Sequence, residues 1–172
     1  MVRAALAGKA LNRGPVRGAA YAPAISVAIA SLLSALPIVS LSGWWPSFGL
    51  LMFIAWRMLR ADAWPAWWAA PLGLFNDLMT GAPIGMSMAL WTSIMLVMDL
   101  VDRRTQWRDY WIEWAVASLL IAASAWVEAE VSSLSGASVR TAMTIPAALI
   151  EVLTFPLAAF MAIRIDRWRL GR

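Results

Sequence analysis

Six apolar runs, separated by short connections, make up most of this chain and limit what it can fold into. A helix that crosses the hydrocarbon core of a bilayer needs roughly 20 apolar residues, with about 17 to 25 usual. The sequence predicts helices of this kind over residues 22–41, 44–59, 64–79, 84–101, 110–129 and 142–165. The second and third runs are short, so these helices must lie near the bilayer normal or be shielded by their neighbours.

The composition agrees with a membrane protein. Of the 172 residues, 62% are apolar and 14% are charged, whereas a soluble domain has about 45–50% apolar and about 25% charged residues. The chain also holds 12 Trp, a residue that settles at the headgroup level of bilayers. We therefore expect an all-α six-helix transmembrane bundle, with residues 1–172 forming one domain and residues 1–21 a basic N-terminal segment.

The basic residues predict the orientation of this bundle. With the N-terminus in the cytoplasm, Arg140 is the only one of the 14 basic residues that falls outside the cytoplasmic stretches. Those stretches hold Arg3, Lys9, Arg13, Arg17, Arg57, Arg60, Arg103, Arg104, Arg108, Arg164, Arg167, Arg169 and Arg172. Cytoplasmic loops of membrane proteins carry such an excess, so both termini are predicted to be cytoplasmic. A secretory signal is the alternative for the N-terminal stretch, but its apolar run is nearly full length and lacks a clear cleavage site.

The chain contains no Cys and no His. It therefore lacks thiolate nucleophiles, imidazole bases and the usual zinc and haem ligands, and we expect no metal, no cofactor and no catalytic residue. The formal net charge of +4 is a possible sign of nucleic-acid binding. Basic residues dispersed between apolar runs are more simply explained as orientation signals, so we expect no nucleic-acid partner.

An acidic residue within a membrane span is costly, about 2.5–3.5 kcal/mol at mid-helix, and Asp77 is the first that needs a reason. Gly73, Asp77 and Gly81 follow one another at intervals of four, so they share one face of the third helix. Thr80 and Gly81 are expected to end that helix, and Pro83 suits the first turn of the next. The residues expected to form this hairpin site are Gly73, Asn76, Asp77, Gly81, Pro83 and Gly85.

Two roles remain open for Asp77. Its carboxylate can accept hydrogen bonds from the exposed amides at the start of the fourth helix, as a structural clasp. It can also contact a partner helix or a ligand. The two roles are compatible.

Glu151 is the second intramembrane acid, and it lies between Pro146 and Pro156 in the sixth run. Each proline removes a backbone hydrogen bond and frees a carbonyl group. Three roles are open for Glu151: a proton relay, a hydrogen bond between helices, or part of a groove that faces a partner.

The other acidic residues in or near the spans have simpler explanations. Asp99 lies four residues before Arg103 on one helical face, which favours an ion pair between them. Glu113 lies near a cytoplasmic helix end, and Glu128 and Glu130 lie where the fifth helix meets the outer surface, so hydration accounts for all three.

Three stretches together resemble one protein family. They are WPSFGLLMFIAWRMLR (45–60), WPAWWAAPLGLFNDLMTGAPIG (64–85) and ALWTSIMLVMDLVDRR (89–104). The chain is similar here to MreD, a small membrane protein of the bacterial rod-shape machinery. The most specific part is the pattern G-x-x-x-D-x-x-x-G-x-P-x-G that begins at Gly73. One departure is Ser47 after Pro46, where the family often carries an acidic residue.

The resemblance implies a non-enzymatic scaffold in the bacterial inner membrane. Proteins of this family sit with the partner MreC and are linked to RodA, to a penicillin-binding transpeptidase and, indirectly, to MreB filaments. Their fold is thought to be similar to the S components of vitamin transporters. The hairpin around Asp77 is expected at or beside the MreC contact, with Glu151 as a second candidate.

Two other classes of function remain open. The first is an S-component-like transporter subunit that binds a small molecule, which would need several polar groups converging in an outward cavity. The second is an intramembrane enzyme, which would depend on Asp77 acting with Glu151. Nothing in the sequence indicates that these two residues meet.

Overall fold

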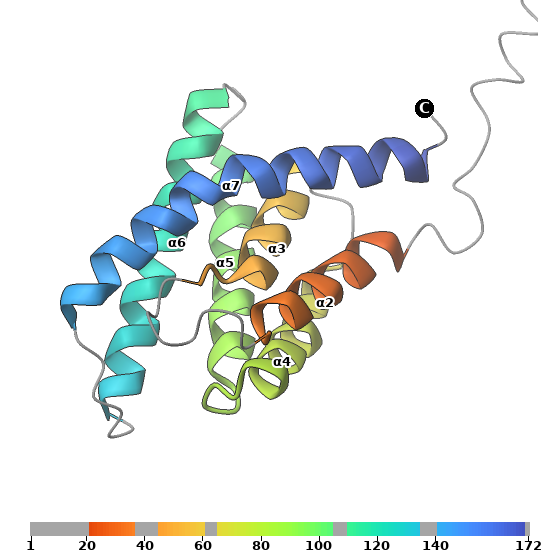
Figure 1. Ribbon diagram of the computed structural model, residues 1–172. Coiled ribbons are helices and arrows are strands. Elements are labelled where there is room, and N and C mark those ends of the chain that lie inside the picture. Colours follow the sequence, from red (N-terminus) through yellow and green to blue (C-terminus); the bar gives the residue numbers. More distant parts are fainter. Residues whose placement is uncertain (1–20, 37–44, 61–64, 105–109, 135–140, 171–172) are drawn as a thin grey trace, which may run out of the picture.

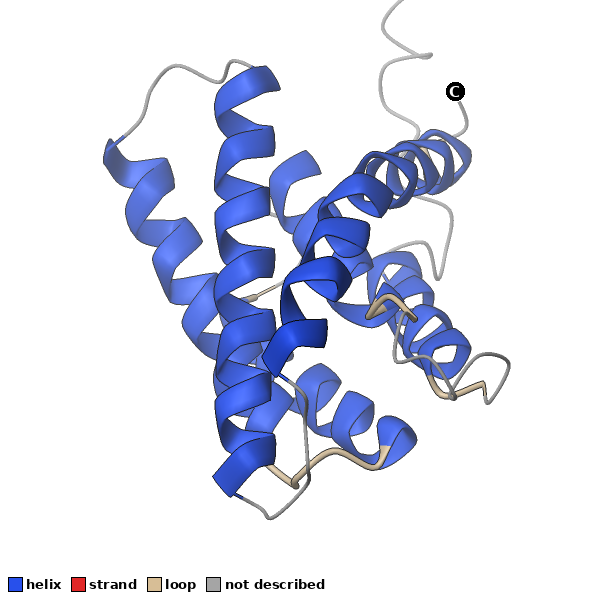
Figure 2. Ribbon diagram, turned by 60° about the vertical axis from the view of Figure 1, so that its left-hand side comes forward, coloured by secondary structure: helices blue, strands red, loops and turns tan. Residues whose placement is uncertain are grey.

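The computed structural model describes residues 21–36, 45–60, 65–104, 110–134 and 141–170. This part of the chain contains helices and loops and no strand (Figure 2). The elements are α2 (Ala22–Ser34), α3 (Phe48–Leu59), the short 3₁₀ helix η2 (Ala66–Trp68), α4 (Ala69–Thr80), α5 (Met86–Arg104), α6 (Tyr110–Leu134) and α7 (Thr141–Arg169). Each of the six predicted apolar runs therefore contains an α-helix, and the all-α class is confirmed for the described residues.

Several helix boundaries differ from those predicted. The first helix was expected to reach residue 41, but α2 ends at Ser34, since Pro37 disfavours a helical conformation at the residue before it. Helix α3 begins at Phe48 rather than at residue 44, because it starts only after Pro46. The third run begins as η2 and becomes an α-helix at Ala69.

The later helices are longer than predicted. Helix α5 continues to Arg104, α6 to Leu134 and α7 to Arg169. The connection expected to begin at Glu130 is therefore helical for its first turn. Residues of good or neutral helix propensity at these ends allow continuation, and hydropathy alone does not mark where a helix leaves the bilayer.

Helix α3 lies at the centre of the bundle (Figure 1). All ten of its residues from Gly49 to Met58 are buried, and it packs against α2 and α7, while α4 packs against α5 and α2. The α4–α5 connection lies at the lower end of the bundle in Figure 1, and the C-terminal end of α7 lies at the upper end. A helix hydrophobic on all sides is typical of a buried core element.

Among the described residues, two helices are long and apolar enough to cross a membrane: Trp111–Leu134 within α6 and Thr144–Arg169 within α7. Helices α2, α3 and α4 have 13, 12 and 12 residues, which corresponds to about 18–20 Å, less than the roughly 30 Å of a bilayer core. The structure thus supports two spans by length and composition. Six spans and cytoplasmic termini stay predictions.

Candidate functional site

The Asp77 carboxylate joins the end of α4 to the start of α5. It accepts hydrogen bonds from the backbone N–H groups of Gly85 and Ser87, each at 2.9 Å. Asp77 is only 1% exposed. The beginning of a helix has amides without helical partners and a partial positive charge, so a buried carboxylate there is well placed. These are the bonds of the clasp predicted from the sequence.

Asn76 adds a side-chain contact to the same hairpin, because its Nδ2 donates to Ser87 Oγ at 3.1 Å. Gly73 lies against the α5 backbone, where an added Cβ would be 2.6 Å from Met88 Cα. Two short helices therefore approach at backbone distance, as small residues permit in membrane bundles.

The turn between α4 and α5 depends on two glycines. Gly81 ends α4 in the left-handed region with φ of 71°, and Gly85 has φ of 93°. Glycine adopts such angles without the steric cost that other residues meet. Pro83, expected in the first turn of the next helix, instead lies in the connection three residues before Met86, and its carbonyl accepts the Met86 N–H at 3.0 Å.

Apolar side chains cover the outside of this hairpin. Leu78 and Ile84 are 59% and 79% exposed, and Met79 is also exposed. We call these three residues the hairpin tip. A buried carboxylate thus fixes the backbone of the same hairpin that carries these exposed apolar side chains.

Glu151 occupies a corresponding position at the start of α3. Its Oε1 accepts the backbone N–H of Ser47 at 2.9 Å, and Glu151 is 7% exposed. Ser47 is the residue that precedes α3. Of the three roles open for Glu151, the structure places it in a hydrogen bond between helices.

A polar cavity of about 740 Å³ lies between these two clasps, and we call it the polar chamber. Its polar lining residues are Ser34, Ser47, Asn76, Thr80, Ser87, Glu128 and Ser132. Ser47 and Ser87, whose amides are bound by Glu151 and Asp77, are part of its wall. The chamber therefore sits where α2, α3, α6 and the α4–α5 hairpin meet.

Glu128 is the residue that sequence reasoning missed. It was expected to be a hydrated residue at the outer end of the fifth helix, but it is half-buried, lines the chamber and lies within electrostatic range of Asp77 and Glu151. The three acids come from α4, α6 and α7, so no spacing along the chain could reveal that they converge. The available signal was an acidic residue at the end of an apolar run, one helical turn before Ser132.

An ion-pair cluster around a buried arginine lies elsewhere, between α3 and α5. Arg57 is 3% exposed, and its Nη2 contacts Asp99 Oδ1 at 2.5 Å and Asp102 Oδ2 at 2.9 Å. The sequence predicted an Asp99–Arg103 pair, and the Arg103 side chain lies outside the described residues. The Asp99–Arg103 pair therefore stays a prediction, and the contact with Arg57 shows that Asp99 connects α5 to α3.

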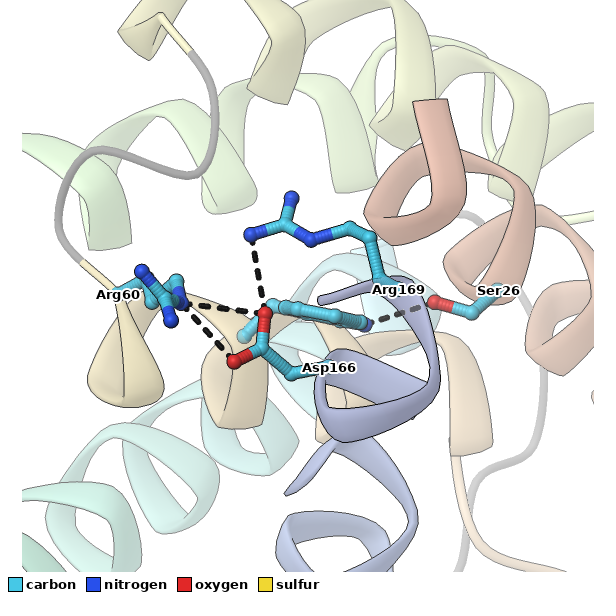
Figure 3. A network of polar contacts seen from close by, with 5 residues as sticks. Ser26, Arg60, Asp166 and Arg169 are labelled. Atoms are coloured by element: carbon cyan, nitrogen blue, oxygen red, sulfur yellow. Dashed lines mark hydrogen bonds and ion pairs between the residues drawn. The ribbon is translucent and has the colours of Figure 1, made fainter. Parts of the chain in front are cut away.

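A second charged network links the ends of α3 and α7 (Figure 3). Asp166 accepts from Arg60 Nε at 3.0 Å and from Arg169 Nη2 at 2.9 Å. The Arg169 guanidinium lies 5.7 Å from the ring centroid of Trp56, whose Nε1 donates to Ser26 Oγ at 2.7 Å. This network fixes the charged end of α7 against α3 and α2.

Comparison with protein-family models, with curated proteins and with solved structures finds no match to this chain. Within the described ranges, no three acidic side chains are arranged to hold a metal ion. The function is therefore inferred from the residues and from the geometry.

Proposed function

We propose that this protein is a non-enzymatic membrane scaffold of the bacterial peptidoglycan elongation machinery, which binds MreC through the hairpin tip. RodA, the penicillin-binding transpeptidase and, indirectly, MreB would be assembled with it. Its place would be the inner membrane, with six spans and both termini in the cytoplasm. The resemblance of residues 45–104 to MreD supports this proposal.

The exterior of the long helices supports a membrane setting. Leu119 and Trp126 on α6 are 71% and 63% exposed, and Leu153 on α7 is 74% exposed. Large apolar surfaces of this kind need a lipid or protein covering. The Arg60 and Arg169 side chains lie together near the C-terminal end of α7 (Figure 3), and the hairpin lies at the opposite end of the bundle (Figure 1), in agreement with a cytoplasmic end rich in arginine.

The observation that favours a protein contact at this place is the construction of the hairpin tip, and the resemblance to MreD suggests MreC as the partner. Leu78, Met79 and Ile84 are exposed while Asp77 beneath them is buried and bonded to two backbone amides. A rigid apolar projection loses little conformational entropy on binding, which favours a protein contact. Lipid alone would not require the backbone below it to be fixed.

The test is recovery of MreC with the tagged chain from crosslinked native membranes. Ile84→Glu places a charge on the hairpin tip, and we expect recovery to fall about tenfold or more, as for the loss of a central interface anchor. Leu134→Glu is the matched control, because Leu134 is an apolar residue 86% exposed at the end of α6. Equal recovery from the Ile84 variant and the unaltered chain, at equal membrane levels, would refute this contact.

A second candidate is an S-component-like subunit of a small-molecule transporter, and the polar chamber is the observation in its favour. Several polar side chains converge there in a cavity of the size that small-molecule sites have, about 300–1,000 Å³. The same crosslinking experiment separates the two candidates. Recovery of wall-elongation proteins supports the scaffold, and recovery of an energising ATPase pair supports the transporter subunit.

A further inference from the structure

Three groups that line the polar chamber, on Thr80, Ser34 and Glu128, offer hydrogen-bond acceptors. The hydroxyl of Thr80 donates its proton to the Asn76 carbonyl at 2.8 Å, and the hydroxyl of Ser34 donates to the Ala30 carbonyl at 3.2 Å. Each hydroxyl has a single proton to give, so these two oxygens offer only lone pairs to the chamber. When it is ionised, the carboxylate of Glu128 is also an acceptor only, and a cation bound beside it favours the ionised form. A ligand group that binds these three acceptors must bring donors.

The charge of the chamber selects the same kind of ligand. Glu128 lines it, and Asp77 and Glu151 lie within electrostatic range of Glu128. Among the described residues of the lining, none carries a positive charge. The negative charge of Asp77 and Glu151 is already bound by backbone amides, whereas the structure gives Glu128 no hydrogen-bond donor within the described part of the chain. A cleft with charge of one sign concentrates ions of the opposite sign.

We propose that the polar chamber binds a small molecule through a positively charged primary amine, with the ammonium group at Glu128. An ammonium group has three donors and no acceptor, which complements a carboxylate together with the Thr80 and Ser34 oxygens. The cavity of about 740 Å³ accommodates a small polar molecule or a lipid headgroup. This proposal does not rest on whether the protein belongs to the elongation machinery or to a transporter.

Two sources can supply this ammonium group, a free amine or the headgroup of phosphatidylethanolamine, and ethanolamine is the chemistry that they share. The first measurement is equilibrium dialysis of the full chain in detergent against radiolabelled ethanolamine. The second is native mass spectrometry of the chain from nanodiscs of phosphatidylglycerol that contain a minor fraction of phosphatidylethanolamine. Saturable binding of ethanolamine would show that a soluble amine is enough to occupy the site. Retention of phosphatidylethanolamine without binding of free ethanolamine would show that the ligand is the lipid headgroup.

Glu128→Gln removes the charge and keeps the shape of the side chain, so we expect the amine to bind about tenfold or more weakly. Glu130→Gln is the matched control, since Glu130 is exposed, lies on the same helix and does not line the chamber. Ser132→Phe fills the chamber from α6 without changing its charge and should also reduce binding. It provides a second test should the Glu128 variant fail to fold.

The inference is overturned if the unaltered chain binds neither probe. It is also overturned if the Glu128 and Glu130 variants bind as tightly as the unaltered chain, or if Ser132→Phe leaves binding unchanged. Ile84 belongs to the hairpin tip and also lines the chamber, so it is left unaltered in the amine-binding tests. Recovery of MreC is measured with the hairpin-tip variant alone, and the two proposals therefore fail separately.

Discussion

The carboxylate of Glu151, in the middle of α7, accepts the backbone N–H of Ser47 at 2.9 Å and thereby binds the start of α3. Helix α3 is buried on all sides, so its first amides cannot all be satisfied by water. The Ser47 side chain makes no capping hydrogen bond to its own helix. Glu151 on the neighbouring helix therefore provides a hydrogen-bond acceptor at the start of α3.

Replacement of Glu151 by Leu should therefore destabilise the bundle by about 1–3 kcal/mol, the cost of a buried donor left without a partner. Glu151→Gln keeps an acceptor oxygen at the same distance and should cost less. Thermal unfolding in detergent, followed by tryptophan fluorescence, ranks the two variants. Equal melting temperatures for Leu and Gln would show that the hydrogen bond contributes nothing.

Asp77 should be more sensitive than Glu151, because its two oxygens accept from two amides. Asp77→Leu leaves both amides unpaired, at an expected cost of about 2 kcal/mol or more. Asp77→Asn retains one acceptor, so its stability should lie between that of the unaltered protein and that of Asp77→Leu. The same thermal measurement applies. We also expect recovery of MreC to fall with Asp77→Leu in protein that still inserts; unchanged recovery would leave Asp77 with the clasp alone.

The glycines of the α4–α5 hairpin should respond differently to alanine. Gly73→Ala would push a methyl group into the α5 backbone, 2.6 Å from Met88 Cα, and overpacking of this kind costs about 1–3 kcal/mol. Gly81 has open space around it but φ of 71°, so Gly81→Ala should cost about 1–2 kcal/mol through backbone strain.

Gly81→Asn distinguishes these two causes, since asparagine tolerates the left-handed region and should be close to neutral. Gly73→Asn should be at least as damaging as Gly73→Ala. Melting temperatures of the four variants provide the comparison. Identical responses at the two positions would contradict the assignment of contact to Gly73 and of strain to Gly81.

The hairpin could be predicted from the sequence because its signals are local. Gly73, Asp77, Gly81 and Gly85 lie within 13 residues, and helix periodicity together with the chemistry of glycine places them on one face and in one turn. The six helices could be predicted for the same reason, since each is a continuous apolar run. The ends of the helices could not be predicted from the apolar runs. They depend on where prolines lie and on whether the residues beyond each run still favour a helix.

The chamber and the Arg57 cluster depend on contacts that sequence spacing does not encode. Glu128 meets Asp77 and Glu151 only through the packing of three helices. Asp99 also pairs with the guanidinium of Arg57, which lies 42 residues earlier in the chain. A buried guanidinium needs a carboxylate partner, and the spacing of residues along the chain does not show that Arg57 is buried.

The Arg57 cluster allows a test in which a second substitution restores what the first removes. Arg57 is 3% exposed, whereas the Asp99 and Asp102 side chains are 39% and 36% exposed. Replacing both acids by Asn leaves a buried guanidinium without a carboxylate, and breaking a buried pair in this way costs about 3–5 kcal/mol. Arg57→Met alone leaves two partly hydrated acids and should cost much less.

The decisive variant combines Arg57→Met with both Asn substitutions. It removes every charge of the cluster and replaces a buried cation, whose Nε and Nη1 have no hydrogen-bond partner in the described part of the chain, by an apolar side chain of similar length. Such replacements of buried ion pairs are often neutral or stabilising. We expect the triple variant to melt well above the double Asn variant, and a triple variant that melts at or below it would show that the ion pair does not hold α3 against α5.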